Sequence, residues 1–214
     1  DTGLELVWCT ADGQFRVPDG GKTVLRGSRE YHELTAAARY IVNNGPQMQG
    51  FEKRHGQVYL QTWHGTPYKH IGYDLVRGGR IAGGIAALGR FVDDVPFWDV
   101  LLSCGPHVTQ VLRSAFRYEG EVWETGYPRN DLLFAADRHE RAQQVRKRLG
   151  LSAGRRTVLY APTWREDVWQ TAGRKAELVL DVDRLAAALG DDHVLLVRQH
   201  HLVADRTVGV GDRV

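Results

Sequence analysis

The chain has 214 residues, which is enough for one large domain or for one domain and part of another. Hydrophobic residues make up 43% of it and charged residues 25%, as in an ordinary globular protein, and the formal net charge of +2 gives no indication of nucleic-acid binding. No apolar run reaches the roughly 18 residues of a membrane span, and the first residues do not resemble a signal peptide.

The first two thirds of the chain alternate between short apolar runs and segments with helical periodicity. Strands are predicted at residues 4–9, 40–42, 58–62, 99–103 and 121–125. Helices are predicted from the capping residue Ser28 to about residue 39, over 79–91, and from Pro106 to residue 116. This strand–helix–strand order predicts an α/β fold with a parallel sheet and crossover helices.

The last third begins with a charged helix, predicted over 138–149, whose polarity suggests a connector between domains. A strand at 157–161, a helix at 183–189 and a strand at 193–198 follow. Two strands and one helix cannot cover both faces of a parallel sheet, so the second domain is expected to be incomplete. The predicted division is a first domain over 1–136, a connector over 137–154 and the start of a second domain over 155–214.

Several common site types are not indicated by the sequence. Cys9 and Cys104 lie far apart, each in or after a strand-like run, and are expected to be buried free thiols in a reducing compartment. None of the nine His residues has the spacing of a zinc site, so no metal is expected. No Gly-rich phosphate loop is found, which argues against a P-loop nucleotidase or a dinucleotide-dependent dehydrogenase.

The strongest local signal is the run QTWHGTPYK at residues 61–69, which leaves a predicted strand at its carboxyl end. Loops at that end line the ligand crevice of open α/β sheets. The Gly and Pro of the run suit a tight turn that would orient His64, whose neutral imidazole can accept a hydroxyl proton. Thr66 and Lys69 are candidates for holding phosphate oxygens. The alternative is a histidine that caps a turn beside a core tryptophan.

Two further motifs also follow predicted strands. The run GYPRND at residues 126–131 consists of turn residues around Arg129 and Asp131, which form either part of a ligand site or a local salt bridge. The run LYAPTWR at residues 159–165 ends in Arg165, which either grips a phosphate with two hydrogen bonds or lies on a solvated loop.

A fourth motif, RQHH, spans residues 198–201 at the end of the last predicted strand. Adjacent residues of a strand point to opposite faces, so only one of His200 and His201 can face a cleft.

Together and in this order, the four motifs resemble the CDP-glycerol glycerophosphotransferase family of teichoic acid synthesis, over about residues 7–201. The resemblance implies two Rossmann-like domains that face a cleft in the GT-B arrangement, with the acceptor bound mainly by the first and CDP-glycerol by the second. The sequence departs from the family pattern at Tyr68, where an aliphatic residue is frequent, and at His201, where a proline is common.

By the same resemblance, His64 corresponds to the catalytic base and His200 to a second-domain histidine near the donor phosphates. The substrate-binding residues that it implies are Thr66, Lys69, Asp74, Arg129, Asp131, Thr163, Arg165 and Arg198.

The implied reaction transfers glycerol phosphate from CDP-glycerol to the terminal hydroxyl of a teichoic-acid-like or capsular polymer and releases CMP, without a cofactor. The implied partners are CDP-glycerol and a lipid-linked polyol-phosphate acceptor, at the cytoplasmic face of the bacterial membrane with peripheral contact, and not nucleic acid. Three alternatives stay open: a CDP-ribitol transferase, a nucleotide-sugar transferase of the same fold, and a non-catalytic module that binds a polyanion.

Overall fold

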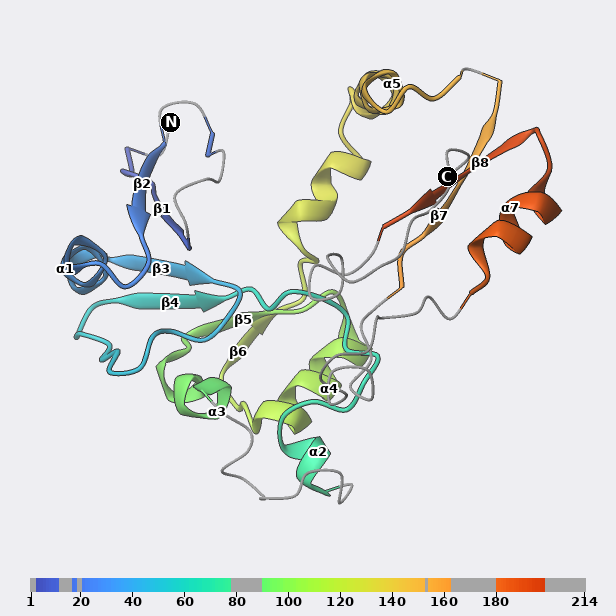
Figure 1. Cartoon of the computed structure of the whole chain (residues 1–214). Coiled ribbons are helices and arrows are strands. Elements are labelled where there is room, and N and C mark those ends of the chain that lie inside the picture. The colour runs from blue at the N-terminus through green and yellow to red at the C-terminus, as the bar shows by residue number, and fades with distance from the viewer. Residues whose placement is uncertain are drawn as a thin grey trace, which may run out of the picture. The chain divides into compact units, whose positions relative to one another are not determined.

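The computed structural model describes residues 3–11, 17–18, 21–77, 90–152, 154–162 and 180–198. The chain divides into two compact units, Asp1–Leu133 and Phe134–Val214 (Figure 1). Every strand pair among the described residues is parallel, which confirms the predicted α/β fold with parallel sheets.

The first unit alternates strands with helices. Its elements are β1 (Val7–Thr10), β2 (Lys22–Leu25), α1 (Arg29–Ala37), β3 (Tyr40–Asn43), β4 (Val58–Gln61), α2 (Tyr73–Arg77), α3 (Arg90–Asp94), the 3-10 helix η2 (Val95–Phe97), β5 (Val100–Leu102), α4 (Pro106–Phe116), β6 (Glu121–Trp123) and the 3-10 helix η3 (Pro128–Leu133).

The main sheet of this unit has the order β3-β4-β5-β6, whereas β1 and β2 pair separately (Figure 1). Because its four strands are parallel, the segments that follow β4, β5 and β6 all leave from one edge of the sheet. That edge is where ligands bind in open α/β folds. The motifs predicted to carry function at residues 61–69 and 126–131 both lie there.

Helix α4 contributes four residues to the hydrophobic core of the first unit. It begins at Pro106 as predicted, and its buried residues Val108, Leu112, Ala115 and Phe116 recur at helical spacing. They join a cluster with Tyr59 and Leu101 of β4 and β5, both fully buried, and with Trp63, Trp98 and Tyr118. The strand ends are therefore anchored in a packed interior.

Local signals account for other element boundaries. The Ser28 hydroxyl accepts a hydrogen bond from Tyr31 N at 3.1 Å and so caps α1, as predicted. Strand β2 was not predicted, because three of its four residues are exposed and its sequence lacks a clear alternation. Of the predicted helix over 79–91, the structure describes only residues 90 and 91, which lie in α3.

The second unit contains α5 (Arg138–Arg148), β7 (Arg156–Tyr160), α7 (Val182–Leu189) and β8 (His193–Val197) among its described residues. Strands β7 and β8 pair in parallel over five residues each. The Arg146 guanidinium joins α5 to this sheet, because it donates hydrogen bonds to Thr157 Oγ1, Ser152 O and Arg155 O at 2.8–3.0 Å.

The two thiols only partly match the prediction. Cys9 and Cys104 are both free, as predicted, but both are exposed, so the prediction of burial is wrong. Cys9 lies in the small two-stranded sheet, and Cys104 lies just beyond the end of β5, in the loop rather than in the buried strand. Of the helices that the structure describes, none is both long and apolar enough to span a bilayer.

Candidate functional site

The site is built around the loop that follows β4. Thr62 continues the strand pairing, since its N–H donates to Asn43 O at 2.8 Å. Trp63 then adopts a left-handed backbone with φ 52°, a conformation that a bulky residue rarely takes. Its indole is buried against Phe91 and Phe116, with ring centroids 5.1 and 4.9 Å away. This turn places the next residue, His64, outside the core.

His64 is an exposed residue with one face of its ring covered. The imidazole stacks on the Trp63 indole, with centroids 4.1 Å apart and planes 24° from parallel. Partial burial, and secondarily the positive charge of Arg129, lower the pKa of His64 below its ordinary value. The ring is therefore neutral at neutral pH, which is the form that accepts a proton.

The second motif reaches the same place from β6. The hydroxyl of buried Tyr127 donates to Gly65 O at 3.3 Å, and the Arg129 guanidinium donates to His64 O at 3.0 Å. Arg129 also lies over the Tyr127 ring, 4.7 Å from its centroid. The structure thus brings together His64 and Arg129, two of the predicted site residues. The contact observed for Arg129 is with the backbone of the histidine rather than with Asp131.

Tyr127 and Cys104 are site residues that sequence reasoning missed. Burial and the neighbouring Cys104 raise the pKa of Tyr127 to about 12, so its hydroxyl stays a donor to the loop. Cys104 Sγ lies 3.7 Å from Thr66 Oγ1. The sequence signal was available in both cases: Tyr127 lies inside the GYPRND motif, and Cys104 follows a buried strand at the same sheet edge.

Three further predicted site residues lie close to His64 or Arg129 in the sequence. Thr66, Lys69 and Asp131 are exposed, the last within η3. Tyr68, one of the departures from the family pattern, is 95% exposed. These side chains are accessible to a ligand.

Asp74 has a contact within the protein. It lies in the first turn of α2 and accepts a hydrogen bond from Ser114 Oγ of α4 at 2.7 Å. Gly72 makes this approach feasible: its φ is +54°, and a Cβ there would lie 2.1 Å from Ala115 O. Asp74 therefore links α2 to α4 through a hydrogen bond, and this contact is evidence of a structural role for its side chain.

In the second unit, the described part of the predicted site is one sheet edge. Ala161 and Pro162 follow β7, and Arg198 follows β8, where its N–H donates to Tyr160 O at 2.9 Å. The Arg198 residue is exposed. The other predicted residues of this unit, Thr163, Arg165 and His200, lie outside the described residues.

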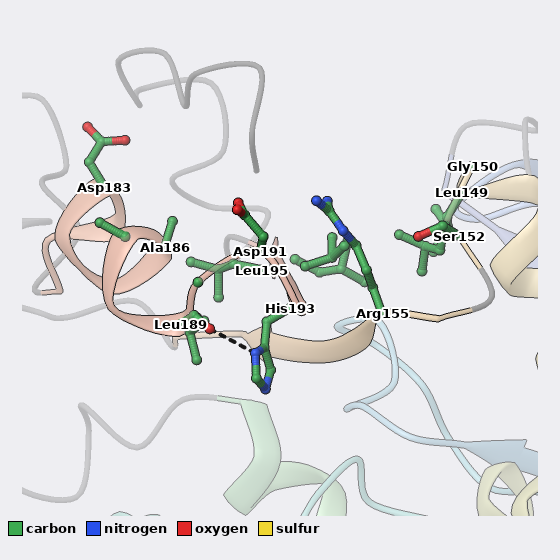
Figure 2. A pocket seen from close by; sticks show the side chains of 15 residues that line it. Leu149, Gly150, Ser152, Arg155, Asp183, Ala186, Leu189, Asp191, His193 and Leu195 are labelled. Carbon is green, nitrogen blue, oxygen red and sulfur yellow. Dashed lines mark hydrogen bonds between the residues drawn. The ribbon is translucent and has the colours of Figure 1, made fainter.

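A hollow of about 1220 Å³ lies in the same unit but at the other end of the strands (Figure 2). Its lining includes Arg155, Asp191 and His193, together with apolar residues of α7 and β8. The His193 Nδ1 atom lies 2.8 Å from Leu189 O, which requires a proton on that nitrogen. Since it lies near the amino ends of β7 and β8, this hollow is separate from the edge that holds Arg198.

Within the ranges that the structure describes, no group of three or more His, Cys, Asp or Glu residues is arranged to hold a metal ion.

Comparisons with known proteins agree on one family. The family model described as CDP-Glycerol:Poly(glycerophosphate) glycerophosphotransferase matches residues 1–212. The teichoic acid poly(glycerol phosphate) polymerase of Staphylococcus epidermidis is 36% identical over 194 residues, which are 88% of this chain and 27% of that protein. The polymerase of the same name from Bacillus subtilis is 34% identical over 206 residues, or 94% of this chain and 28% of the relative.

Solved structures give the same result. The wall teichoic acid polymerase TagF superposes with a TM-score of 0.83 at 34% identity, over 96% of this chain and 51% of the other. A variant of TagF soaked with CDPG superposes with a TM-score of 0.81 at 32% identity, over 96% and 50%. The chain thus spans about half the length of these solved chains and less of the curated relatives.

Proposed function

This chain belongs to the CDP-Glycerol:Poly(glycerophosphate) glycerophosphotransferase family, and we propose that it forms part of an enzyme that transfers glycerol phosphate from CDP-glycerol to a growing poly(glycerol phosphate) chain. The names of its relatives and the CDPG soak of TagF support the donor and the polymer. The observation within this chain that carries the proposal is His64: an accessible imidazole with a lowered pKa, at the sheet edge where ligands bind.

In the proposed reaction, the terminal hydroxyl oxygen of the acceptor attacks the glycerol-bearing phosphorus of CDP-glycerol. A new P–O bond forms, the bond to the bridging oxygen breaks, and CMP leaves with that electron pair. The hydroxyl proton passes to the free ring nitrogen of His64. General base catalysis of this kind contributes about 10²–10⁴-fold in rate.

The charge that develops on the phosphoryl oxygens and on CMP has to be offset by fixed donors. We assign this role to Arg165, Arg198 and His200 of the second domain. Thr66 and Lys69 of the first domain would bind phosphate groups of the acceptor. With these cations the scheme requires no cofactor. The domains would face each other in the GT-B arrangement, with the acceptor on the first and CDP-glycerol on the second.

The acceptor in this proposal is a lipid-linked polyol phosphate, which would bring the enzyme to the cytoplasmic face of the membrane as a peripheral protein. Family membership is the support for this location, because the reaction requires access to a polymer that is attached to a lipid.

The test is CMP release from CDP-glycerol by the intact protein with His64→Ala, and its matched control is His55→Ala. Both histidines are exposed and flank β4, but His55 lies in the turn before the strand, at the end opposite to the site. We expect His64→Ala to lower kcat about 10²–10⁴-fold and His55→Ala to leave it unchanged. Wild-type turnover in His64→Ala would remove this residue from the mechanism.

The same assay separates the alternatives. Turnover with CDP-ribitol or a UDP-sugar, but not with CDP-glycerol, would reassign the donor. Salt-sensitive binding of poly(glycerol phosphate) without release of CMP or another nucleotide would indicate a binding module.

A further inference from the structure

A buried polar side chain lies directly beneath the His64 loop. Gln61 is the last residue of β4, and its side chain is fully buried. Its Nε2 donates to Gly45 O at 3.0 Å, and its Oε1 accepts from Trp63 N at 2.9 Å. Only one orientation of the amide satisfies both partners, since a backbone carbonyl only accepts and a backbone N–H only donates.

A second contact of Gln61 extends to a buried carboxylate. The Nε2 atom also lies 3.5 Å from Tyr59 Oη, which in turn donates to Asp94 Oδ2 at 2.8 Å. Burial and the Asp94 charge raise the pKa of Tyr59, so its phenol keeps the proton that it donates. With that proton directed at Asp94, the Tyr59 hydroxyl presents a lone pair to Gln61, which again selects the amide nitrogen.

Asp94 is well placed to hold this arrangement. Its side chain is 4% exposed and also accepts hydrogen bonds from Trp98 Nε1 at 2.7 Å and from Gln47 N at 3.0 Å. Three donors from different segments therefore fix the carboxylate. The chain of contacts from Asp94 through Tyr59 to Gln61 ends at Trp63, whose backbone is left-handed.

We propose that Gln61 is a positioning residue for His64, and that Asp94, acting through Tyr59, fixes the orientation of the Gln61 amide. Gln61 holds the N–H of Trp63 in the turn, and the Trp63 indole supports one face of the His64 imidazole. The inference rests on the proposed function in that His64 is the base, and it adds the group that keeps this base in place.

The protein contains a matched control in Gln57. Its side chain is also buried, at 4% exposure, its Nε2 donates to Thr35 O and Ala38 O, and its Oε1 accepts from Arg54 N. Like Gln61, it donates twice through Nε2 and accepts one backbone N–H through Oε1, but both of its acceptors are backbone carbonyls and it lies just before β4 rather than at its end. Gln61→Met and Gln57→Met each remove three hydrogen bonds of a buried amide, so a merely structural role predicts similar results for both.

The experiment measures three properties of the intact wild type and of both variants. We expect both variants to lower Tm by similar amounts. We expect kcat for glycerol phosphate transfer to fall about 100-fold in Gln61→Met alone, because a misplacement of a catalytic group by about 1 Å can lower the rate that much. KM for CDP-glycerol should stay within about twofold of the wild-type value. In NMR titrations with ¹⁵N-labelled histidine, assigned with His64→Gln, the pKa of His64 should rise only in Gln61→Met.

Equal kcat values and equal His64 titrations in the two variants would overturn the inference. A failure of the proposed function would look different: no transfer by the wild type, or full activity in His64→Ala. The titration still reports the placement of His64 in that case.

If Gln61→Met does not fold, Tyr59→Phe against Tyr31→Phe tests the same contacts. Both hydroxyls are buried donors of this region, but Tyr31 Oη donates to Gln47 Oε1 rather than reaching Gln61. We expect kcat to fall about tenfold in Tyr59→Phe and to hold in Tyr31→Phe, a difference of about 1.4 kcal/mol in barrier. Equal kcat values in these two variants would overturn the link to Asp94.

Discussion

The carboxyl edges of the β3-β4-β5-β6 sheet and of the β7-β8 sheet hold their exposed residues in different ways. In the first unit, His64 follows a strand whose last side chain is buried, stacks on a buried tryptophan and has its carbonyl bound by Arg129. In the second, Arg198 is fixed through its backbone N–H, and Leu195 is the one buried hydrophobic residue in the part of that unit that the structure describes.

This difference shows what determines the position of a reactive group. At the first edge, side chains from β4, the loop after β6 and the core all act on one histidine, so substitutions there should change chemistry and stability together. At the second edge, the described residues contribute little buried surface, so substitutions that leave Arg198 in place should mainly change local stability. The predictions below test this contrast, from the largest expected effect to the smallest.

Trp63→Ala should have the largest effect on stability. It removes a buried indole that contacts Phe91, Phe116 and His64, and truncations of this kind cost about 3–5 kcal/mol. The measurement is urea unfolding of the intact protein. Trp123→Ala on β6 is the control: its side chain is 45% exposed, and we expect a loss below about 1 kcal/mol. Equal losses in the two variants would mean that the His64 loop is not anchored in the core.

Gly72→Ala should cause the second largest loss of stability. Gly56 and Gly72 both have positive φ, but a Cβ at Gly56 meets nothing within 4 Å, whereas at Gly72 it meets Ala115 O. Gly56→Ala should cost about 1–2 kcal/mol for the backbone conformation, and Gly72→Ala about 1–3 kcal/mol more for overpacking. Thermal unfolding of the two variants would separate the terms, and equal losses would show that α2 does not pack closely on α4.

Arg146→Ala tests the second unit. The guanidinium makes three hydrogen bonds that join α5 to the start of β7, and each is worth about 0.5–1.5 kcal/mol. We expect a loss of about 2 kcal/mol, seen as faster amide exchange in β7 and β8. Lys147→Ala, the exposed neighbour, should change exchange little. If kcat falls more than the folded fraction in Arg146→Ala, the packing of α5 on the second sheet affects the chemistry as well.

The sequence was sufficient to predict the fold in outline. Start and stop residues located the helices to within a few residues: Ser28 before α1, Pro106 at the start of α4, and Gly150 and Gly190 after α5 and α7. Short apolar runs located most strands. Strand β2 and helix α2 were not predicted, since a strand with three exposed residues and a five-residue helix carry no such signal.

The site could be predicted in part. Motif order and strand ends predicted both His64 and Arg129 as site residues, and the structure shows that these two residues are in contact. The burial of Gln61 and the contact of Asp74 with Ser114 were not predictable, because each depends on a partner 16 or 40 residues away in the chain. Long-range polar contacts of this kind leave no periodic signal in one sequence.

Arg129 offers the smallest but most specific test of the first edge. Burial, and secondarily the Arg129 charge, keep the pKa of His64 low. Arg129→Gln removes the charge, so the pKa of His64 should rise. At acidic pH, a smaller fraction of His64 is then neutral and able to accept a proton. The acid limb of the kcat/KM profile should therefore move to higher pH. The loss should be greatest on that limb and should shrink at alkaline pH to the part caused by the missing guanidinium contact with His64 O.

Arg129→Lys separates charge from geometry. Lysine keeps the positive charge but not the planar fork that reaches His64 O and lies over Tyr127. We expect the acid limb of Arg129→Lys to stay where it is in the wild type, while kcat falls a few-fold at every pH because the histidine is held less firmly. An acid limb that moves equally in both variants would mean that the contact with the backbone of His64, rather than the charge, sets its pKa.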